Sequence, residues 1–171
     1  GLQPPHTKEG ERGLIPDKEV EVNRENVVSD NDMHDLGIVF PAAVGVWVGQ
    51  SIGSRISHNH IHHLNYSGIS VGWNWSYTPQ ACHHNIIEYN HIHHISNMLS
   101  DLGGIYTLGV QPGTVLRNNL IHDISSFANW GWGIYLDQSS SYILVENNVV
   151  YRAVAGSFLP HYGYDNVVRN N

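Results

Sequence analysis

The feature of this sequence that most limits its fold is a motif that recurs six times. The motif is an apolar residue, two spacers and Asn, followed in five of the six copies by one spacer and a second apolar residue. Its Asn residues follow one another at intervals of 28, 31, 29, 29 and 23 positions: Asn31, Asn59, Asn90, Asn119, Asn148 and Asn171. A repeat of this length indicates a solenoid, in which each unit buries its apolar face against its neighbours.

A second pattern lies between these motifs. Each of the first five Asn residues is followed by a Gly that opens a short alternating run, as in residues 104–107 (Gly-Ile-Tyr-Thr) and 133–136 (Gly-Ile-Tyr-Leu). Alternation with β-branched and aromatic residues is typical of strands, and the Gly-, Asn- and Ser-rich segments between them are typical of turns. Each repeat is therefore predicted to hold about three short strands and no helix.

Two kinds of solenoid carry an Asn in such a repeat. A leucine-rich repeat needs another apolar residue two positions before the motif, where this chain is mostly polar, and a Leu-rich return that it lacks. In a parallel β-helix the coils stack about 4.8 Å apart, so equivalent buried Asn amides can pair in a ladder. We predict an all-β, right-handed parallel β-helix of about five coils over residues 22–171, with residues 1–21 a poorly ordered or loop segment. We also expect the chain to be a piece of a longer protein, truncated at its C-terminal end.

Composition excludes several classes of partner. Charged residues make up 13% of the 171 residues, about half the usual share, and 8 Lys and Arg against 15 Asp and Glu give a net charge of −7. Because no basic surface is available to neutralise phosphates, we expect no nucleic-acid partner. No segment approaches the roughly 20 apolar residues that span a bilayer, so we expect no membrane partner. The single Cys82 excludes an internal disulfide.

The alternation in the Gly-led strands separates inward from outward side chains. Ile105 and Ile134 are predicted to point into the core. The outward side chains of successive coils should then form one column: Trp47, Ser70, Tyr106 and Tyr135. The step from the motif Asn to this strand is 14 positions in three coils and 8 or 9 in two, and a long insertion, 73–85, follows the strand in another coil. Loops concentrated beside one face usually build the binding side of a solenoid.

Those loops are rich in tryptophan. Trp73 and Trp75 lie in one of them, and Trp130 and Trp132 in another. The C–H faces of a sugar ring pack well on aromatic rings, so exposed aromatics beside a groove suit a carbohydrate. Each Trp could also anchor its own loop. As a set, they favour an aromatic substrate-binding groove that includes the two outward tyrosines.

Thirteen His residues suggest a metal site, but their spacing favours another arrangement. Four of them share one outward position of the predicted third strand in successive coils: His34, His62, His93 and His122. Rings about 4.8 Å apart can stack without an ion, whereas a zinc site needs three or four converging ligands. We therefore expect a stacked His ladder whose imidazoles are oriented by Asp35 and Asp123, with no metal and no other cofactor.

Two acidic residues stand beside the aromatic column. Asp101 comes three residues before the strand expected to begin at Gly104, and Asp137 ends the equivalent strand one coil later, facing outward. One protonated and one ionised carboxyl are what glycoside hydrolysis requires. The loop before Gly104 must bring Asp101 back over this face, because the two positions are far apart along aligned strands. His161 lies one coil beyond Asp137 and could assist it, although each of these residues could instead stabilise a turn.

The ordered combination of these segments resembles one enzyme family. Residues 101–107 (Asp-Leu-Gly-Gly-Ile-Tyr-Thr), 131–137 (Gly-Trp-Gly-Ile-Tyr-Leu-Asp) and 161–163 (His-Tyr-Gly), separated by the Asn repeats, are similar to the β-helix glycoside hydrolases of family 141. The resemblance covers residues 80–171 and extends more loosely from residue 26. It implies α-L-fucosidase or xylanase activity on plant cell-wall glycans, with the two aspartates as the catalytic pair, and an extracellular or periplasmic location.

Two other functions stay open beside the hydrolase. A polysaccharide lyase or epimerase on this fold needs a Lys, an Arg or a Tyr/His pair to abstract a proton, often with Ca²⁺ held by an acidic cluster. No lysine follows Lys18, and the arginines from Arg55 onward fall on the other two predicted strands, which leaves a Tyr106/His161 pair. The second alternative is a non-catalytic sugar-binding or structural β-helix. The hydrolase is favoured, with a polysaccharide or oligosaccharide as its substrate.

Overall fold

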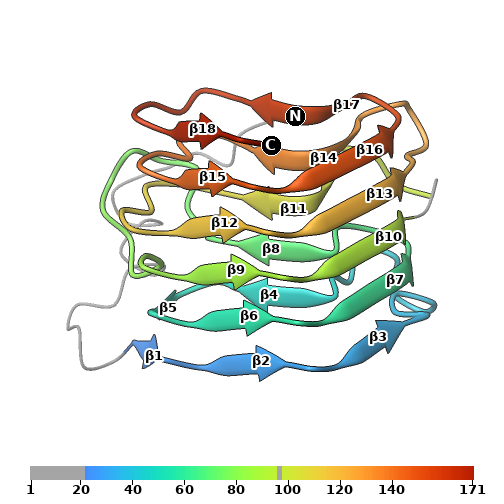
Figure 1. The fold of residues 1–171 in the computed structure, drawn as a ribbon, viewed down its shortest axis with the longest axis horizontal. Helices are drawn as coiled ribbons and strands as arrows, with labels where there is room; N and C mark the ends of the chain where they lie inside the picture. Colours follow the sequence, from blue (N-terminus) through green and yellow to red (C-terminus); the bar gives the residue numbers. More distant parts are fainter. Residues whose placement is uncertain (1–21, 96–97) are drawn as a thin grey trace.

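The computed structural model describes residues 22–95 and 98–171, which form a stack of coils bounded by three parallel β-sheets (Figure 1). Each coil contributes one strand to each sheet, and every strand pairs in parallel with its equivalent in the adjacent coil. The predicted all-β parallel β-helix is confirmed. The expectation for residues 1–21 lies outside the described residues.

We name the sheets after the side chains that mark them. The ladder sheet contains the strands that precede the motif Asn residues: β2 (Val27–Ser29), β6 (Arg55–Ser57), β9 (Ile86–Glu88), β12 (Val115–Arg117), β15 (Leu144–Glu146) and β18 (Val167–Arg169). The His sheet contains the strands that follow them: β3 (Asp32–His34), β7 (His60–Leu64), β10 (His91–Ile95), β13 (Leu120–Ile124) and β16 (Val149–Ala153). The aromatic sheet contains the Gly-led strands: β4 (Val46–Val48), β8 (Ile69–Val71), β11 (Leu102–Thr107), β14 (Gly131–Leu136) and β17 (Gly156–Pro160).

Two details differ from the sequence-based expectation. The two five-stranded sheets span four full turns, slightly fewer than the five or so coils predicted. The strand β11 begins at Leu102 rather than at Gly104, because its first residues pair with Gly131 and Trp132 of β14. A further short parallel pair, β1 (Asn23–Arg24) and β5 (Ser51–Ile52), lies beside the main sheets.

The motif Asn residues form a continuous ladder. Each Nδ2 donates a hydrogen bond of 2.8–3.0 Å to Oδ1 of the equivalent Asn in the next coil. That Oδ1 also accepts the main-chain N–H of the preceding Asn, at 3.0–3.2 Å. The four inner residues of the ladder are each no more than 2% exposed: Asn59, Asn90, Asn119 and Asn148. Because these buried amides find partners only when equivalent residues are aligned, the ladder fixes the register of the coils.

A sharp turn precedes each ladder Asn. The residue before it has a left-handed backbone with φ between 54° and 59°, although none of these residues is Gly: Asp30, His58, Tyr89, Asn118, Asn147 and Asn170. This conformation costs a non-Gly residue roughly 1–2 kcal/mol. The ladder hydrogen bonds on the next residue offset that cost, and the turn directs the chain from the ladder sheet into the His sheet.

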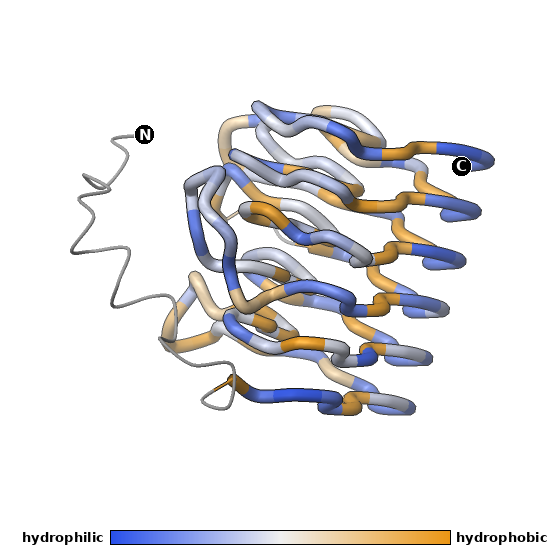
Figure 2. The backbone as a smooth tube through the Cα atoms, turned by 90° about the vertical axis from the view of Figure 1, so that its left-hand side faces the viewer, coloured by the Kyte–Doolittle hydropathy of each residue, from blue (hydrophilic) through white to orange (hydrophobic). Residues whose placement is uncertain are grey.

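The core lies inside the coils and receives side chains from all three sheets. In one coil, Ile56, Ile61 and Ile69 come from the three sheets, and each is no more than 1% exposed. Their equivalents in the next coil, Ile87 and Ile92 among them, are as deeply buried. Figure 2 shows hydrophobic segments recurring at the same place in successive coils. Burial of one such side chain is worth roughly 1.5–3 kcal/mol. Among the described residues there is no helix long and apolar enough to cross a bilayer.

Candidate active site

The outward face of the aromatic sheet carries the predicted column of side chains. Trp47 pairs with Ser70, Ser70 with Tyr106, and Tyr106 with Tyr135 across four adjacent strands. The inward neighbours Val46, Ile69, Ile105 and Ile134 are all buried in the core. The period-two assignment of this strand is therefore confirmed.

Asp137 follows β14 directly and is held at the floor of this face. It is only 6% exposed. Its Oδ2 accepts the hydroxyl hydrogen of Tyr106. Its Oδ1 lies 3.0 Å from the hydroxyl oxygen of Tyr135 and 2.9 Å from Nδ1 of His161. Three polar groups from three successive coils therefore converge on one buried carboxyl group.

Asp101 immediately precedes β11 and is exposed, with a left-handed φ of 60°. Its main-chain N–H donates to the carbonyl of Trp130 in the next coil at 2.9 Å. Its own carbonyl accepts the hydroxyl hydrogen of Tyr66 from the previous coil at 3.0 Å. Contacts with the coils on both sides thus set the position of this loop residue.

The hydroxyl of Tyr135 joins the two aspartates. Its oxygen lies 3.1 Å from Oδ1 of Asp101 and 3.0 Å from Oδ1 of Asp137. These two distances add to an upper limit of 6.1 Å between the Oδ1 atoms. Gly103 helps to make this contact possible, because a Cβ there would lie 3.1 Å from Cβ of Tyr135 and 2.7 Å from the carbonyl oxygen of Ile105. The structure therefore brings together the two acidic residues that the sequence placed at opposite ends of aligned strands.

The tyrosines around the carboxyl groups stay protonated. Burial and the nearby Asp137 carboxylate raise the pKa of both Tyr106 and Tyr135 well above the ordinary value of 10. Burial, followed by Asp101 and Asp137, raises the pKa of Tyr66 as well. All three hydroxyls are therefore hydrogen-bond donors, and none is suited to abstract a proton.

An aromatic groove of about 440 Å³ opens beside these groups. Its lining includes Trp47, Tyr66, Trp73, Trp75 and Tyr106. The ring centroids of Trp47 and Trp73 are 4.9 Å apart, and those of Trp73 and Trp75 are 5.9 Å apart. The predicted groove thus contains the first Trp pair and reaches the acids through Tyr66 and Tyr106.

The second Trp pair is placed differently. Trp132 packs its ring on Tyr135, with centroids 4.5 Å apart, and is partly buried beside it. Trp130 is 60% exposed, and its main-chain carbonyl accepts the N–H groups of Asp101 and Leu102. Neither of these residues lines the groove of the first pair. Trp132 supports the Tyr135 ring, and the Trp130 carbonyl anchors the Asp101 loop.

Tyr66 is the site residue that sequence reasoning missed. It stands in the short loop before β8, two residues before Gly68, and carries no motif of its own. The only available signal was its place in the set of loops that precede the aromatic sheet. The ring is partly buried against the core, and its hydroxyl reaches Asp101 in the next coil.

The His ladder forms on the other side of the coil, as predicted. Rings of His34, His62, His93 and His122 stack with centroids 5.0–5.1 Å apart and interplanar angles of 3–10°. Asp35 and Asp123 contact Nδ1 of the neighbouring His34 and His122 at 2.7 and 2.6 Å. Among the described residues, the two side-chain groups that could hold a metal ion lie on this His sheet: His60, His91 and His93, and Asp32, His60 and His62.

Comparison with known proteins agrees with this architecture. A family model described as "Right handed beta helix region" matches residues 18–171. The chain belongs to this right-handed β-helix family. A solved structure titled "Glycoside hydrolase" superposes on 92% of the chain with a TM-score of 0.84 and 29% sequence identity. The chain covers 27% of the length of that protein. No curated protein sequence matches the chain.

Proposed function

We propose that this right-handed β-helix is the catalytic region of a glycoside hydrolase, with Asp101 and Asp137 as its carboxyl pair. The observation that carries the proposal is the Tyr135 hydroxyl, which contacts both carboxyl groups beside an aromatic groove. The solved glycoside hydrolase with the same fold supports the reaction class. Two carboxyl groups in opposite protonation states are the equipment that this reaction needs.

Hydrogen counting around Tyr135 supports an unequal pair. A hydroxyl has one hydrogen, yet the Tyr135 oxygen contacts both Asp101 and Asp137. If Tyr135 donates to Asp137, the contact with Asp101 becomes a hydrogen bond when Asp101 is the protonated partner. We assign the carboxylate role to Asp137, because its oxygens accept the hydroxyl hydrogen of Tyr106 and lie against Nδ1 of His161.

The two aspartates then have different roles, one as the nucleophile and the other as the acid. Asp137, ionised and fixed by its neighbours, is placed to attack the anomeric carbon, and Asp101, exposed on its loop, is placed to protonate the leaving oxygen. The separation of at most 6.1 Å between their Oδ1 atoms is below the roughly 6.5–9.5 Å of inverting enzymes and compatible with the roughly 5–5.5 Å of retaining ones. We therefore infer a retaining mechanism. After the first step Asp101 would accept a proton from water and release the sugar from Asp137.

The substrate follows from the groove and from the resemblance to family 141. Tilted and edge-on rings of Trp47, Trp73 and Trp75 offer flat apolar faces to the C–H faces of sugar residues. A plant cell-wall glycan, either a xylan or a fucosylated polysaccharide, is the substrate that the resemblance implies. Because such polysaccharides lie outside cells, an extracellular or periplasmic location belongs to the same proposal.

The test is product analysis with purified protein on xylan and on fucosylated pectin. We expect new reducing ends without unsaturated uronate products, and an initial product that keeps the anomeric configuration of the substrate. Asp137→Asn should abolish turnover of all substrates. Asp101→Asn should spare the first step on activated aryl glycosides, because a good leaving group needs little protonation, and should slow the second step, in which Asp101 acts as the base. Asp30→Asn is the matched control, since Asp30 is an exposed turn residue outside the site.

The outcomes separate the alternatives. Unsaturated products would identify a lyase, which the protonated Tyr106 and its donation to Asp137 argue against. Sugar binding without any product would identify a non-catalytic module. Full activity in both aspartate variants would show that the carboxyl pair is assigned wrongly.

A further inference from the structure

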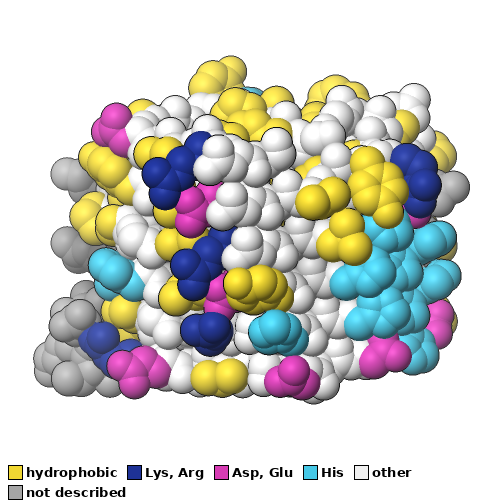
Figure 3. Space-filling model, in the orientation of Figure 1, with side chains coloured by type: hydrophobic (Ala, Val, Ile, Leu, Met, Phe, Trp, Pro, Cys, Tyr) yellow, Lys and Arg dark blue, Asp and Glu magenta, His cyan; other side chains and the backbone are white. Residues whose placement is uncertain are grey.

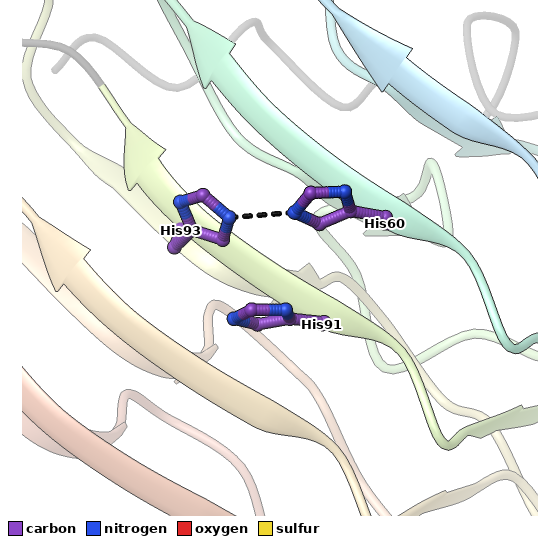
Figure 4. Close-up of side chains that lie close together, drawn as sticks. All are labelled: His60, His91 and His93. Carbon is purple, nitrogen blue, oxygen red and sulfur yellow. Dashed lines mark hydrogen bonds between the residues drawn. The ribbon is translucent and has the colours of Figure 1, made fainter.

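Three imidazoles converge on the His sheet at the junction of two coils. His60 belongs to β7, while His91 and His93 belong to β10. One ring nitrogen from each residue lies within 4.8 Å of those of the other two. The close-up in Figure 4 shows the His60 and His93 rings facing each other, with His91 beside them. All three side chains are partly buried, and the space-filling view in Figure 3 shows a dense His patch at the surface on this side.

Hydrogen bonds around the group set the tautomers of two of these rings. Nδ1 of His60 lies 3.1 Å from Oδ1 of Asp32, and this carboxylate oxygen favours the tautomer with the hydrogen on Nδ1, in which Nε2 keeps its lone pair. Nδ1 of His122 donates to Asp123 at 2.6 Å, so Nε2 of His122 is an acceptor. Nε2 of His91 lies 2.8 Å from it and must donate, which leaves the lone pair of His91 on Nδ1.

His93 can present a lone pair to the same place. Its Nε2 lies 2.7 Å from Nε2 of His60, and its Nδ1 lies 2.5 Å from Nδ1 of His94. Because Nε2 of His60 carries no hydrogen, His93 donates to it while His94 donates to His93. If His94 changes tautomer, the hydrogen of His93 moves from Nε2 to Nδ1. Nε2 of His93 is then a ligand atom, and the neutral rings lose no proton overall.

Burial, followed by the neighbouring imidazoles, lowers the pKa of His91 below 6.5 and that of His93 to about 4. Only the neutral imidazole binds a metal ion.

We propose that His60, His91 and His93 bind one divalent transition-metal ion of the zinc class. Imidazole nitrogens suit Zn²⁺, Cu²⁺ and Ni²⁺, whereas Ca²⁺ and Mg²⁺ prefer oxygen ligands. Zinc–nitrogen bonds of about 2.0–2.1 Å place tetrahedral ligand atoms roughly 3.3–3.5 Å apart, so small rotations of the rings complete the site. Water takes the fourth position. Asp32 acts as the outer carboxylate that orients His60.

The site would join β7 to β10 and thus clamp two adjacent coils. It lies on a different sheet from Asp101 and Asp137, so it does not depend on the proposed hydrolase activity. The alternative set of Asp32, His60 and His62 shares His60. In that set the carboxylate of Asp32 is exposed and already contacts Nδ1 of His60, so we assign the ion to the three imidazoles.

The experiment is calorimetric titration of the protein, prepared without a polyhistidine tag and treated with chelator, with ZnCl₂ at pH 7.5. We expect one saturable equivalent per chain and a rise in the melting temperature on binding. His91→Gln and His93→Gln should each weaken binding more than 10-fold, and Asp32→Asn about 10-fold. His84→Gln is the control, because His84 contacts its neighbour His83 in the same Nδ1-to-Nδ1 way but lies outside the cluster.

A spectroscopic arm covers the case in which a variant fails to fold. Titration of the unmodified protein with Co²⁺ should give the visible absorption bands of a tetrahedral nitrogen-ligated ion. Absence of saturable zinc uptake, or absence of these bands, would overturn the proposal. Wild-type zinc affinity in folded His91→Gln and His93→Gln would overturn it as well, because the metal would then be held elsewhere on the surface.

Discussion

Removing one amide from the middle of the Asn ladder is the most direct test of what holds the coils in register. In Asn90→Ala, four side-chain hydrogen bonds disappear. The Nδ2 group of Asn90 donates to Oδ1 of Asn119 and to the carbonyl of Ile56, both at 3.0 Å. Its Oδ1 accepts the main-chain and side-chain N–H groups of Asn59 at 3.1 and 3.0 Å. The Oδ1 atom of Asn119 keeps one partner, because the main-chain N–H of residue 90 still donates to it.

The magnitude follows from the groups left without a partner. Two N–H groups of Asn59 become unsatisfied in a residue that is only 1% exposed, while the carbonyl of Ile56 keeps the main-chain N–H of Glu88 as its partner in the sheet. Each buried unsatisfied group costs about 1–3 kcal/mol. Entry of a water molecule into the space left by the side chain would recover part of this cost. We therefore expect Asn90→Ala to lower the free energy of unfolding by about 2–5 kcal/mol, a large share of the roughly 5–15 kcal/mol typical of a domain.

Asn31→Ala is the control within the same ladder. Asn31 is exposed, and its side chain donates to Oδ1 of Asn59 and to the carbonyl of Ser29, at 2.9 and 2.8 Å. Oδ1 of Asn59 retains the main-chain N–H of residue 31 as a partner, and solvent reaches the rest. We expect a loss of less than about 1 kcal/mol.

The assay is urea unfolding followed by circular dichroism, with hydrogen exchange to locate the coils that open first. The free energies of unfolding of the two variants are compared only if their m-values are equal, because a solenoid can lose cooperativity when one coil is weakened. Amides of the coils on either side of residue 90 should lose protection in Asn90→Ala and keep it in Asn31→Ala. If the two variants were destabilised equally, to within about 0.5 kcal/mol, the argument that buried amide pairing fixes the register would be refuted.

Three further predictions concern the site, the His sheet and the groove. Tyr135→Phe keeps the ring and removes the hydroxyl shared by the two carboxyl groups. We expect kcat to fall about 10- to 100-fold while the protein stays folded. An unchanged kcat in steady-state assays would contradict the proposed role of Tyr135. The folded pKa of His93 is about 4 and that of His91 is also lowered, so the unfolded chain takes up protons first as the pH falls. The free energy of unfolding should therefore decline from about pH 6.5 to 4, by less than about 1.4 kcal/mol per pH unit for each ring. Urea midpoints at pH 7.5 and 5 measure this decline, and His93→Gln should show a smaller difference than the wild type. Gly72 has a φ of +98°, and a Cβ there would lie 2.0 Å from the carbonyl oxygen of Leu108. Gly72→Ala should therefore lower the free energy of unfolding by more than about 2 kcal/mol and distort the groove. A melting curve like that of the wild type would contradict this prediction.

The register of the coils could be predicted from the sequence because it depends on short-range periodicity. The Asn at one phase of each repeat, with apolar residues at fixed offsets, leaves a single alignment that buries the inner amides and the core Ile and Leu side chains together. A shift by one residue would turn each strand's apolar side chains outward. The aromatic column over Tyr106 and Tyr135 and the stacked His rings follow from the same alignment.

The loops obey no such rule, and they determine the candidate site. The sequence placed Asp101 on the correct side of the coil but began its strand at Gly104, where the structure begins it at Leu102. The reach of Asp101 to Tyr135 depends on the space beside Gly103 and on the carbonyl of Trp130 from the next coil. Tyr66, whose hydroxyl holds the carbonyl of Asp101, belongs to the preceding coil and to no pattern.

The division has one physical cause. Hydrophobic burial and amide pairing act identically in every repeat, so the sequence by itself determined the β-helix, its three faces and the vertical neighbours on each face. The distance between two carboxyl groups depends on single contacts between a loop and the coils above and below it. Those contacts exist only after the stack has formed, and only the tertiary structure decided which of the outward residues meet around the Tyr135 hydroxyl.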